Sequence, residues 1–442
     1  MEISLILGIS VLFFLSYYSF NDLFSPSCIT CCSFLLAFLC SLLSSNFGDW
    51  KLSLGIKSQS CILLGLFCFY SGSIFAKKIK TSVLHDCQKD QQKLNLIYFS
   101  RNKLRLILVI QIVILCIFLY FYKKAISQFS GLEWHEMMRA YRFATSYGDG
   151  LEENIPSFVN HLTKIPKVNG YISFYILVHN LTVQKFTKTR SSNNKLLLLI
   201  VLLYLPLNIL NAARFEVVVL ICMGIIIWYT IYRRCLIIKK YQYHPHKIIE
   251  KITIFVFCCM CFFSIFGQVV GRNASDNLIS QSADYFGRNI QAFDLFVEES
   301  DKYNSDRFET FFGINKLLKQ LQIIEGDVGS IHQDFIEKDG VSLGNTYTSL
   351  KRYYSDLSYL GLIVFPFICG FIFTRLYKRT QYIKIGTINF GLICYGSISY
   401  CLFLYGYDDY LFSSILSFNY LIIFTLMYMV IKWLTVSKHT KK

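Results

Sequence analysis

Two charged residues near the end of a long hydrophilic segment, Arg352 and Asp356, have types and spacing that suit phosphate chemistry. They lie four positions apart in the stretch KRYYSD, so on a helix they share one face. A guanidinium binds phosphate oxygens through two parallel N–H bonds and keeps its charge. Beside a carboxylate at the membrane surface, it suits a lipid pyrophosphate and an attacking sugar hydroxyl. A plain interfacial salt bridge fits the spacing equally well.

A second arginine, Arg214, lies in LNILNAARFEVVVL between two apolar runs. This position holds it at the outer membrane surface, where inserting the charge costs less than the about 2.5–3.5 kcal/mol of a central arginine. The side chain still needs water, a lipid phosphate or a substrate anion as its partner. Snorkelling toward water is the alternative explanation.

Other polar residues are weaker candidates for anion binding or proton transfer. Four further outward arginines can each bind an anion or simply be solvated, and they are Arg139, Arg142, Arg272 and Arg288. His332 has a side chain whose ordinary pKa suits general-base work. The pair Asp408–Asp409 resembles half of a metal-binding DxD motif, but a short acidic connector between helices explains it better. Cysteine clusters within apolar runs indicate small helix residues, so we expect neither a metal site nor a cofactor.

The elements that must position these residues are membrane-spanning helices. The 442-residue chain is 54% hydrophobic, with a mean hydropathy of +0.44, which exceeds what a soluble core can bury. Each apolar run is long enough to cross a hydrocarbon layer of about 30 Å. We expect eleven spans, at residues 3–20, 26–45, 58–76, 104–122, 168–184, 196–211, 215–232, 252–270, 357–375, 386–405 and 411–433.

Charge then orients these spans. Five connecting segments carry 26 of the 44 Lys and Arg residues but only three acids, so the positive-inside rule places them in the cytoplasm. Segment 271–356 instead holds 14 acids against nine bases in a chain of net charge +16. We therefore predict that it faces outward and that the C-terminus is cytoplasmic. The high pI reflects this topology, and we expect no nucleic-acid partner.

This reading divides the chain into three parts. Residues 1–270 form the first eight spans, with an outward loop near 123–167; 271–356 form a large outer cap; 357–442 form the last three spans and a basic tail. In the loop, SGLEWHEMMRAYRFAT predicts a helix ending before Gly148. In the cap, DYFGRNIQAFDLFVEE and INKLLKQLQII predict two amphipathic helices lying over the bundle.

Several classes of protein are disfavoured. The chain has no Walker loop, dinucleotide fingerprint, HExxH or GxSxG motif. Its spans are nearly free of Asp and Glu, which counts against a proton-coupled carrier.

Four stretches together resemble one bacterial family, the O-antigen polymerases, also called Wzy-type oligosaccharide repeat unit polymerases. These stretches are FNDLFSPSCITCCSFLLAF, NAARFEVVV, DYFGRNIQAFD and GNTYTSLKRYYSDLSYLG. The resemblance runs nearly the whole length, and the last stretch is its most specific part. The chain departs from the family pattern after Asp356, where Leu357 and Ser358 stand in place of the usual glycine.

The resemblance implies an all-α, polytopic, GT-C-like fold in the bacterial inner membrane, with the large loop in the periplasm. It implies a metal-independent glycosyltransferase that needs no cofactor. The enzyme would move glycan from undecaprenyl pyrophosphate onto the non-reducing end of another lipid-linked repeat unit. Its partners would be these lipid-linked units, membrane lipids and a chain-length regulator protein.

The same resemblance suggests roles for individual residues. Arg214 and Arg352 would bind the pyrophosphate. Asp356 would position or deprotonate the acceptor hydroxyl, with His332 in reserve, and Tyr347 and Tyr353 would stack on sugars or anchor the membrane interface.

Two other functions remain open at this stage. An O-antigen ligase uses the same donor but transfers glycan to lipid A-core. Only the particular residues of the motif stretches favour a polymerase. A lipid-linked oligosaccharide flippase belongs to a different class, which usually has short loops and charges inside its bundle.

Overall fold

The fold is known from a computed structural model. The residues it describes are 2–47, 50–79, 93–147, 154–189, 191–210, 215–245, 248, 250, 278–299, 308–325, 328 and 331–436. Two predicted arginines, Arg214 and Arg272, and the predicted span 252–270 lie outside them.

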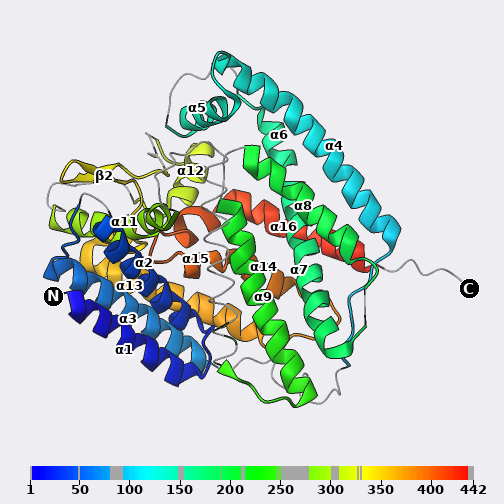
Figure 1. Ribbon diagram of the computed structural model, residues 1–442, viewed down its shortest axis with the longest axis horizontal. Coiled ribbons are helices and arrows are strands. Elements are labelled where there is room, and N and C mark those ends of the chain that lie inside the picture. The colour runs from blue at the N-terminus through cyan, green and yellow to red at the C-terminus, as the bar shows by residue number, and fades with distance from the viewer. Residues whose placement is uncertain are drawn as a thin grey trace, which may run out of the picture. The chain divides into compact units, whose positions relative to one another are not determined.

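The described chain is mostly helical (Figure 1). Its α-helices are α1 (Glu2–Phe20), α2 (Pro26–Phe47), α3 (Ile56–Lys78), α4 (Arg101–Ile126), α5 (Trp134–Tyr147), α6 (Ser157–Leu162), α7 (Lys164–Thr187), α8 (Asn194–Leu210), α9 (Phe215–Lys239), α11 (Leu278–Glu298), α12 (Phe312–Gln320), α13 (Leu350–Thr380), α14 (Phe390–Ile398), α15 (Tyr400–Phe403) and α16 (Phe418–Thr435).

Seven of the described helices are long and apolar enough to cross a membrane: α1, α2, α3, α4, α9, α13 and α16. They coincide with seven predicted spans, so the chain is an all-α, multi-pass membrane protein. Predicted spans 168–184 and 196–211 fall in α7 and in the shorter apolar helix α8. Span 386–405 is divided between α14 and α15. The total of eleven stays a prediction.

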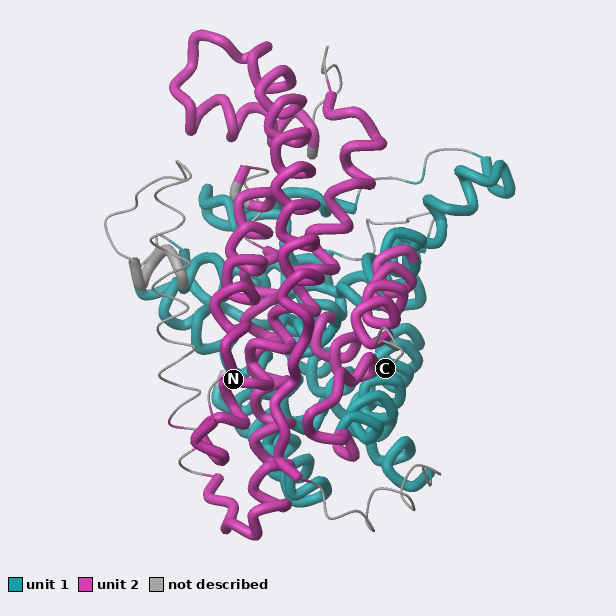
Figure 2. The backbone as a smooth tube through the Cα atoms, turned by 90° about the vertical axis from the view of Figure 1, so that its right-hand side faces the viewer, with its two compact units in different colours: residues 1–84, 275–380, 398–421 teal, residues 85–274, 381–397, 422–442 magenta. Residues whose placement is uncertain are grey.

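The chain forms two compact units (Figure 2), and each is described by itself. Unit 1 contains residues 1–84, 275–380 and 398–421, and unit 2 contains residues 85–274, 381–397 and 422–442.

In unit 1, α3 and α13 pack closely along each other. A Cβ atom added at Gly72 would lie 2.0 Å from the carbonyl oxygen of Phe367, and one added at Gly370 would lie 2.0 Å from that of Phe69. Only glycine allows the two backbones to approach this closely, as is common between membrane helices.

Helix α11 is more deeply integrated than a cap lying on the surface. The predicted helix and its apolar stripe are confirmed, since Ile290, Phe293 and Val297 are buried. However, its polar residues Asn289 and Asp294 are buried too. Asp294 Oδ1 accepts a hydrogen bond from the Gly55 backbone N–H at 2.7 Å, which caps the start of α3. Polar side chains of α11, which the sequence pattern predicts to face water, therefore bond to the helix bundle.

The second predicted cap helix is present as α12, and a short hairpin follows it. Strands β1 (Ile336–Lys338) and β2 (Val341–Gly344) are antiparallel. Asp339 and Gly340 form the two-residue turn with φ of 54° and 78°, as a type I′ turn requires.

Unit 2 contains the predicted loop helix, here α5, which ends at Tyr147 as expected. It packs against α4, α6 and α8 through a core that includes Phe118, Tyr122, Tyr141, Val159 and Leu207.

Candidate functional site

Helix α13 is broken near its start. Leu357 has φ −137° and ψ 17°, and Ser358 has φ 52° and ψ −135°, neither of which is helical. The Tyr353 and Phe365 rings lie 5.2 Å apart, although twelve residues of a straight helix rise about 18 Å. Residues 350–356 therefore fold back alongside the membrane-crossing part of α13. A Cβ at Gly361 would lie 1.9 Å from the Tyr353 carbonyl oxygen, so this reversal requires glycine there.

The break lies after both Arg352 and Asp356, so the two share one helical segment as predicted, but this segment is not continuous with the membrane-crossing helix and the two side chains have different partners. The Arg352 side chain is 2% exposed, and its Nε pairs with Asp408 Oδ1 at 3.3 Å. Its Nη2 donates to the Ile331 carbonyl at 2.8 Å. The partner of Arg352 is thus 56 residues away in the chain, because the fold-back turns the arginine toward the segment that precedes α16.

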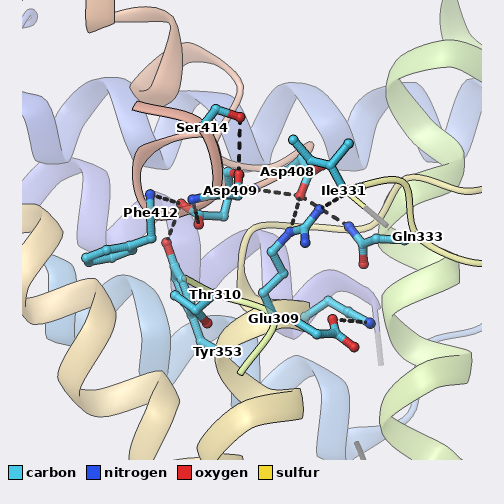
Figure 3. A network of polar contacts seen from close by, with 12 residues as sticks. Glu309, Thr310, Ile331, Gln333, Tyr353, Asp408, Asp409, Phe412 and Ser414 are labelled. Atoms are coloured by element: carbon cyan, nitrogen blue, oxygen red, sulfur yellow. Dashed lines mark hydrogen bonds and ion pairs between the residues drawn. The ribbon is translucent and has the colours of Figure 1, made fainter. Parts of the chain in front are cut away.

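Asp408 and Asp409 belong to a second irregular segment, residues 404–417, which contains the π-helical turn η4 (Leu411–Ile415). Asp408 Oδ1 accepts hydrogen bonds from Gln333 Nε2 at 3.2 Å and from the Asp409 backbone N–H at 2.8 Å, besides its contact with Arg352. Figure 3 shows these groups converging on Asp408. The acidic turn connects α15 to α16, as expected, and Asp408 in it also binds Arg352.

Asp409 anchors the same segment from inside. It is 1% exposed, and its Oδ1 accepts from the Tyr353 hydroxyl at 2.9 Å and from the Leu411 N–H at 3.1 Å. Its Oδ2 accepts from the Ser413 N–H at 3.2 Å. Burial raises the pKa of Asp409 to about 6; the Tyr353 hydrogen bond and Arg352 oppose this rise, and Asp408 adds to it.

Asp356, which the sequence predicted to be the base, binds the backbone of another segment. Its Oδ1 accepts from the Glu309 N–H at 2.7 Å and its Oδ2 from the Thr310 N–H at 2.8 Å. Lys351 Nζ pairs with Glu309 Oε2 at 2.6 Å, so the chain entering α12 is held at two points. Both carboxylate oxygens of Asp356 are therefore committed to the backbone.

The two predicted tyrosines are packed inside unit 1. Tyr353 has no exposed surface, and Tyr347 is 4% exposed. The Tyr347 hydroxyl donates to the Asp334 carbonyl at 3.1 Å, and its ring packs edge-on against Phe296. Neither ring offers a face for stacking on a sugar in this structure.

The remaining described candidates lie outside the Arg352–Asp408 contact. Arg288 bonds Asp284 Oδ2 at 2.6 Å and the Ser342 carbonyl at 2.7 Å, which joins α11 to β2. His332 is exposed and adjoins Ile331, whose carbonyl holds Arg352. Arg142 lies on α5 in unit 2.

Several buried polar atoms on the segments that form this contact, or bonded to them, lack a hydrogen-bond partner within the described part of the chain, among them Gln333 Oε1, Asn289 Oδ1 and Thr348 Oγ1. Asn289 donates its Nδ2 to the carbonyl of Gly406, two residues before Asp408, and Thr348 precedes Arg352 by four residues. Buried polar groups almost always have partners. Water or a bound molecule would satisfy these atoms, a feature that sequence patterns alone do not reveal.

Among the described residues, no three His, Cys, Asp or Glu side chains are grouped so that they could hold a metal ion. A scan of protein-family models, a search of curated proteins and a search of solved structures found no match to this chain.

Proposed function

We propose that this protein is an O-antigen polymerase, a metal-independent membrane glycosyltransferase of the bacterial inner membrane. It transfers glycan from undecaprenyl pyrophosphate to the non-reducing end of a lipid-linked repeat unit at the periplasmic face. The observation that carries the proposal is the buried Arg352 beside the partly exposed Asp408, within a stretch, GNTYTSLKRYYSD, that resembles this family.

The chemistry supports a lipid-linked pyrophosphate donor. An arginine held in place before substrate arrives can stabilise the charge that develops on a leaving pyrophosphate. The donor already stores the energy for transfer, so the reaction needs no nucleotide-binding motif. In unit 1, the irregular segments 350–358 and 404–417 supply polar groups. A bundle of uninterrupted helices would offer only apolar groups at this place.

The finer features of the fold belong to the same proposal. They are eleven spans, a GT-C-like bundle, a periplasmic cap formed by 271–356 and a cytoplasmic C-terminus. Lipid-linked repeat units, membrane lipids and a chain-length regulator protein would be its partners.

A second candidate function is a flippase for lipid-linked oligosaccharides. Broken helices that carry charged side chains are typical of transporters, and residues 350–358 with 404–417 have that character. Here the family resemblance favours the polymerase over both the flippase and the ligase.

Deletion of the gene tests the proposal. A strain without the polymerase should carry lipid A-core with a single repeat unit, which gel electrophoresis of its lipopolysaccharide would reveal. Bare core would instead indicate a ligase or a flippase and would reject the proposal. Restoring the wild-type gene should return long chains, which excludes effects on neighbouring genes.

A further inference from the structure

We propose that Asp408 is the proton acceptor for the attacking hydroxyl and that Gln333 orients that hydroxyl. The inference rests on the proposed function, because it assigns the base of that same glycosyl transfer.

The contacts of Asp408 leave one oxygen available. Arg352 Nε, Gln333 Nε2 and the Asp409 N–H all bind Oδ1, and 16% of the Asp408 side chain is exposed. The carboxylate is thus fixed through one oxygen while Oδ2 makes none of these three contacts.

Gln333 shows which kind of group fits beside Asp408. Its Nε2 must face the acceptor Asp408, so the orientation of the amide is determined and Oε1 is left as a buried, unpartnered acceptor. A phosphate oxygen cannot satisfy Oε1, because both atoms accept. A hydroxyl can donate there, and so the place next to Asp408 suits an alcohol, with phosphate on Arg352.

Neighbouring carboxylates are less suitable for this role. Both oxygens of Asp356 accept backbone N–H groups. Asp409 is 1% exposed, and both of its oxygens accept hydrogen bonds from η4. The Asp408 carboxylate is held in place by hydrogen bonds and is also partly exposed to solvent.

The acceptor hydroxyl oxygen forms a bond to the anomeric carbon of the donor glycan while its proton passes to Asp408. The bond between that carbon and the phosphate oxygen breaks, and its electron pair leaves with undecaprenyl pyrophosphate. Arg352 stabilises the leaving group, and Asp408 later releases the proton to water.

The test uses the full-length protein in lipid vesicles, with lipid-linked repeat units extracted from the deletion strain. Asp408→Asn keeps the shape of the side chain but accepts a proton poorly, so transfer should fall by about 100-fold or more. Binding of undecaprenyl pyrophosphate, measured separately, should stay within about threefold of wild type, since Arg352 is retained. The exposed turn variant Asp339→Asn is the matched control and should transfer normally.

A second variant separates chemistry from folding. Asp408→Ala should be inactive, and added formate should restore part of the transfer, because a small carboxylate can replace the missing base. Transfer by Asp408→Asn within threefold of wild type, or no rescue of Asp408→Ala by formate, overturns the role of Asp408. A wild-type protein that fails to polymerise overturns the proposed function itself, and the assignment of Asp408 with it.

Discussion

Two buried charge clusters, one in each unit, differ in the regularity of the backbone that carries them. In unit 2, Glu216 on α9 binds Lys167 and Tyr171 on α7 and Tyr204 on α8. In unit 1, Arg352 binds Asp408, and Asp409 lies beside them. Both clusters lie among apolar helices, where an unpaired charge is costly.

The cluster around Glu216 is carried by three regular helices. Lys167 Nζ binds Oε1, and the hydroxyls of Tyr171 and Tyr204 bind Oε2 at 2.8 and 2.7 Å. Around Arg352, by contrast, the charged side chains come from the irregular segments 350–358 and 404–417. The first cluster therefore joins three helices, whereas the second lies where regular helices are interrupted.

The largest expected effect follows from Arg352→Ala. Removing a preorganised group that stabilises leaving-group charge costs about 100- to 1,000-fold in rate, and long polysaccharide should disappear from cells. Arg288→Ala is the matched control from the same unit, since the described hydrogen bonds of the Arg288 side chain go to Asp284 and Ser342. Gel analysis of lipopolysaccharide, with membrane protein levels measured in parallel, gives the result. Normal chain length with Arg352→Ala would show that the cluster in unit 1 does no chemistry.

In contrast to Arg352→Ala, Lys167→Met should lower the stability of the protein and leave its transfer activity unchanged. Removing one partner of a buried pair leaves Glu216 uncompensated and costs about 3–5 kcal/mol of stability. Thermal unfolding in detergent should detect the loss, while transfer per folded molecule stays near wild type. The double variant Lys167→Met with Glu216→Leu should recover most of the stability. A tenfold fall in transfer per folded Lys167→Met molecule would break the distinction between the two clusters.

A smaller effect should appear in the pH dependence of stability. Asp409 has a pKa raised from 3.8 to about 6, so the native state binds its proton more tightly than the unfolded chain does. This contribution is fully present below pH 4 and is lost as pH rises through 6, by about 3 kcal/mol in total. Asp409→Asn does not titrate, and its stability relative to wild type should therefore increase from pH 4 to pH 7. A difference that stays constant over this range would contradict the raised pKa, and Asp339→Asn serves as the control.

Local patterns in the sequence predicted much of the fold. Periodicity located α5, α11 and α12, and hydropathy located seven membrane-crossing helices. The hairpin at Asp339–Gly340 carries a recognised turn signal, Asp-Gly between extended residues, and could have been predicted.

The site was harder to predict because its contacts are distant in sequence. Arg352 and Asp408 meet only because the chain reverses at Leu357 and Ser358, where a serine adopts a positive φ. A continuous helix was the natural expectation for residues with no glycine at that point. The segment resembling the polymerase motif contains both Arg352 and Asp356, and their spacing suggested a pair, whereas the acidic partner of Arg352 in the structure is Asp408.

The most direct test of the central claim is glycan growth by the purified protein. Wild-type protein in vesicles, supplied only with lipid-linked repeat units, should produce a ladder of longer glycans attached to undecaprenyl pyrophosphate, and Arg352→Ala should produce none. No elongation by the wild-type protein, or an equal ladder from Arg352→Ala, would contradict the account.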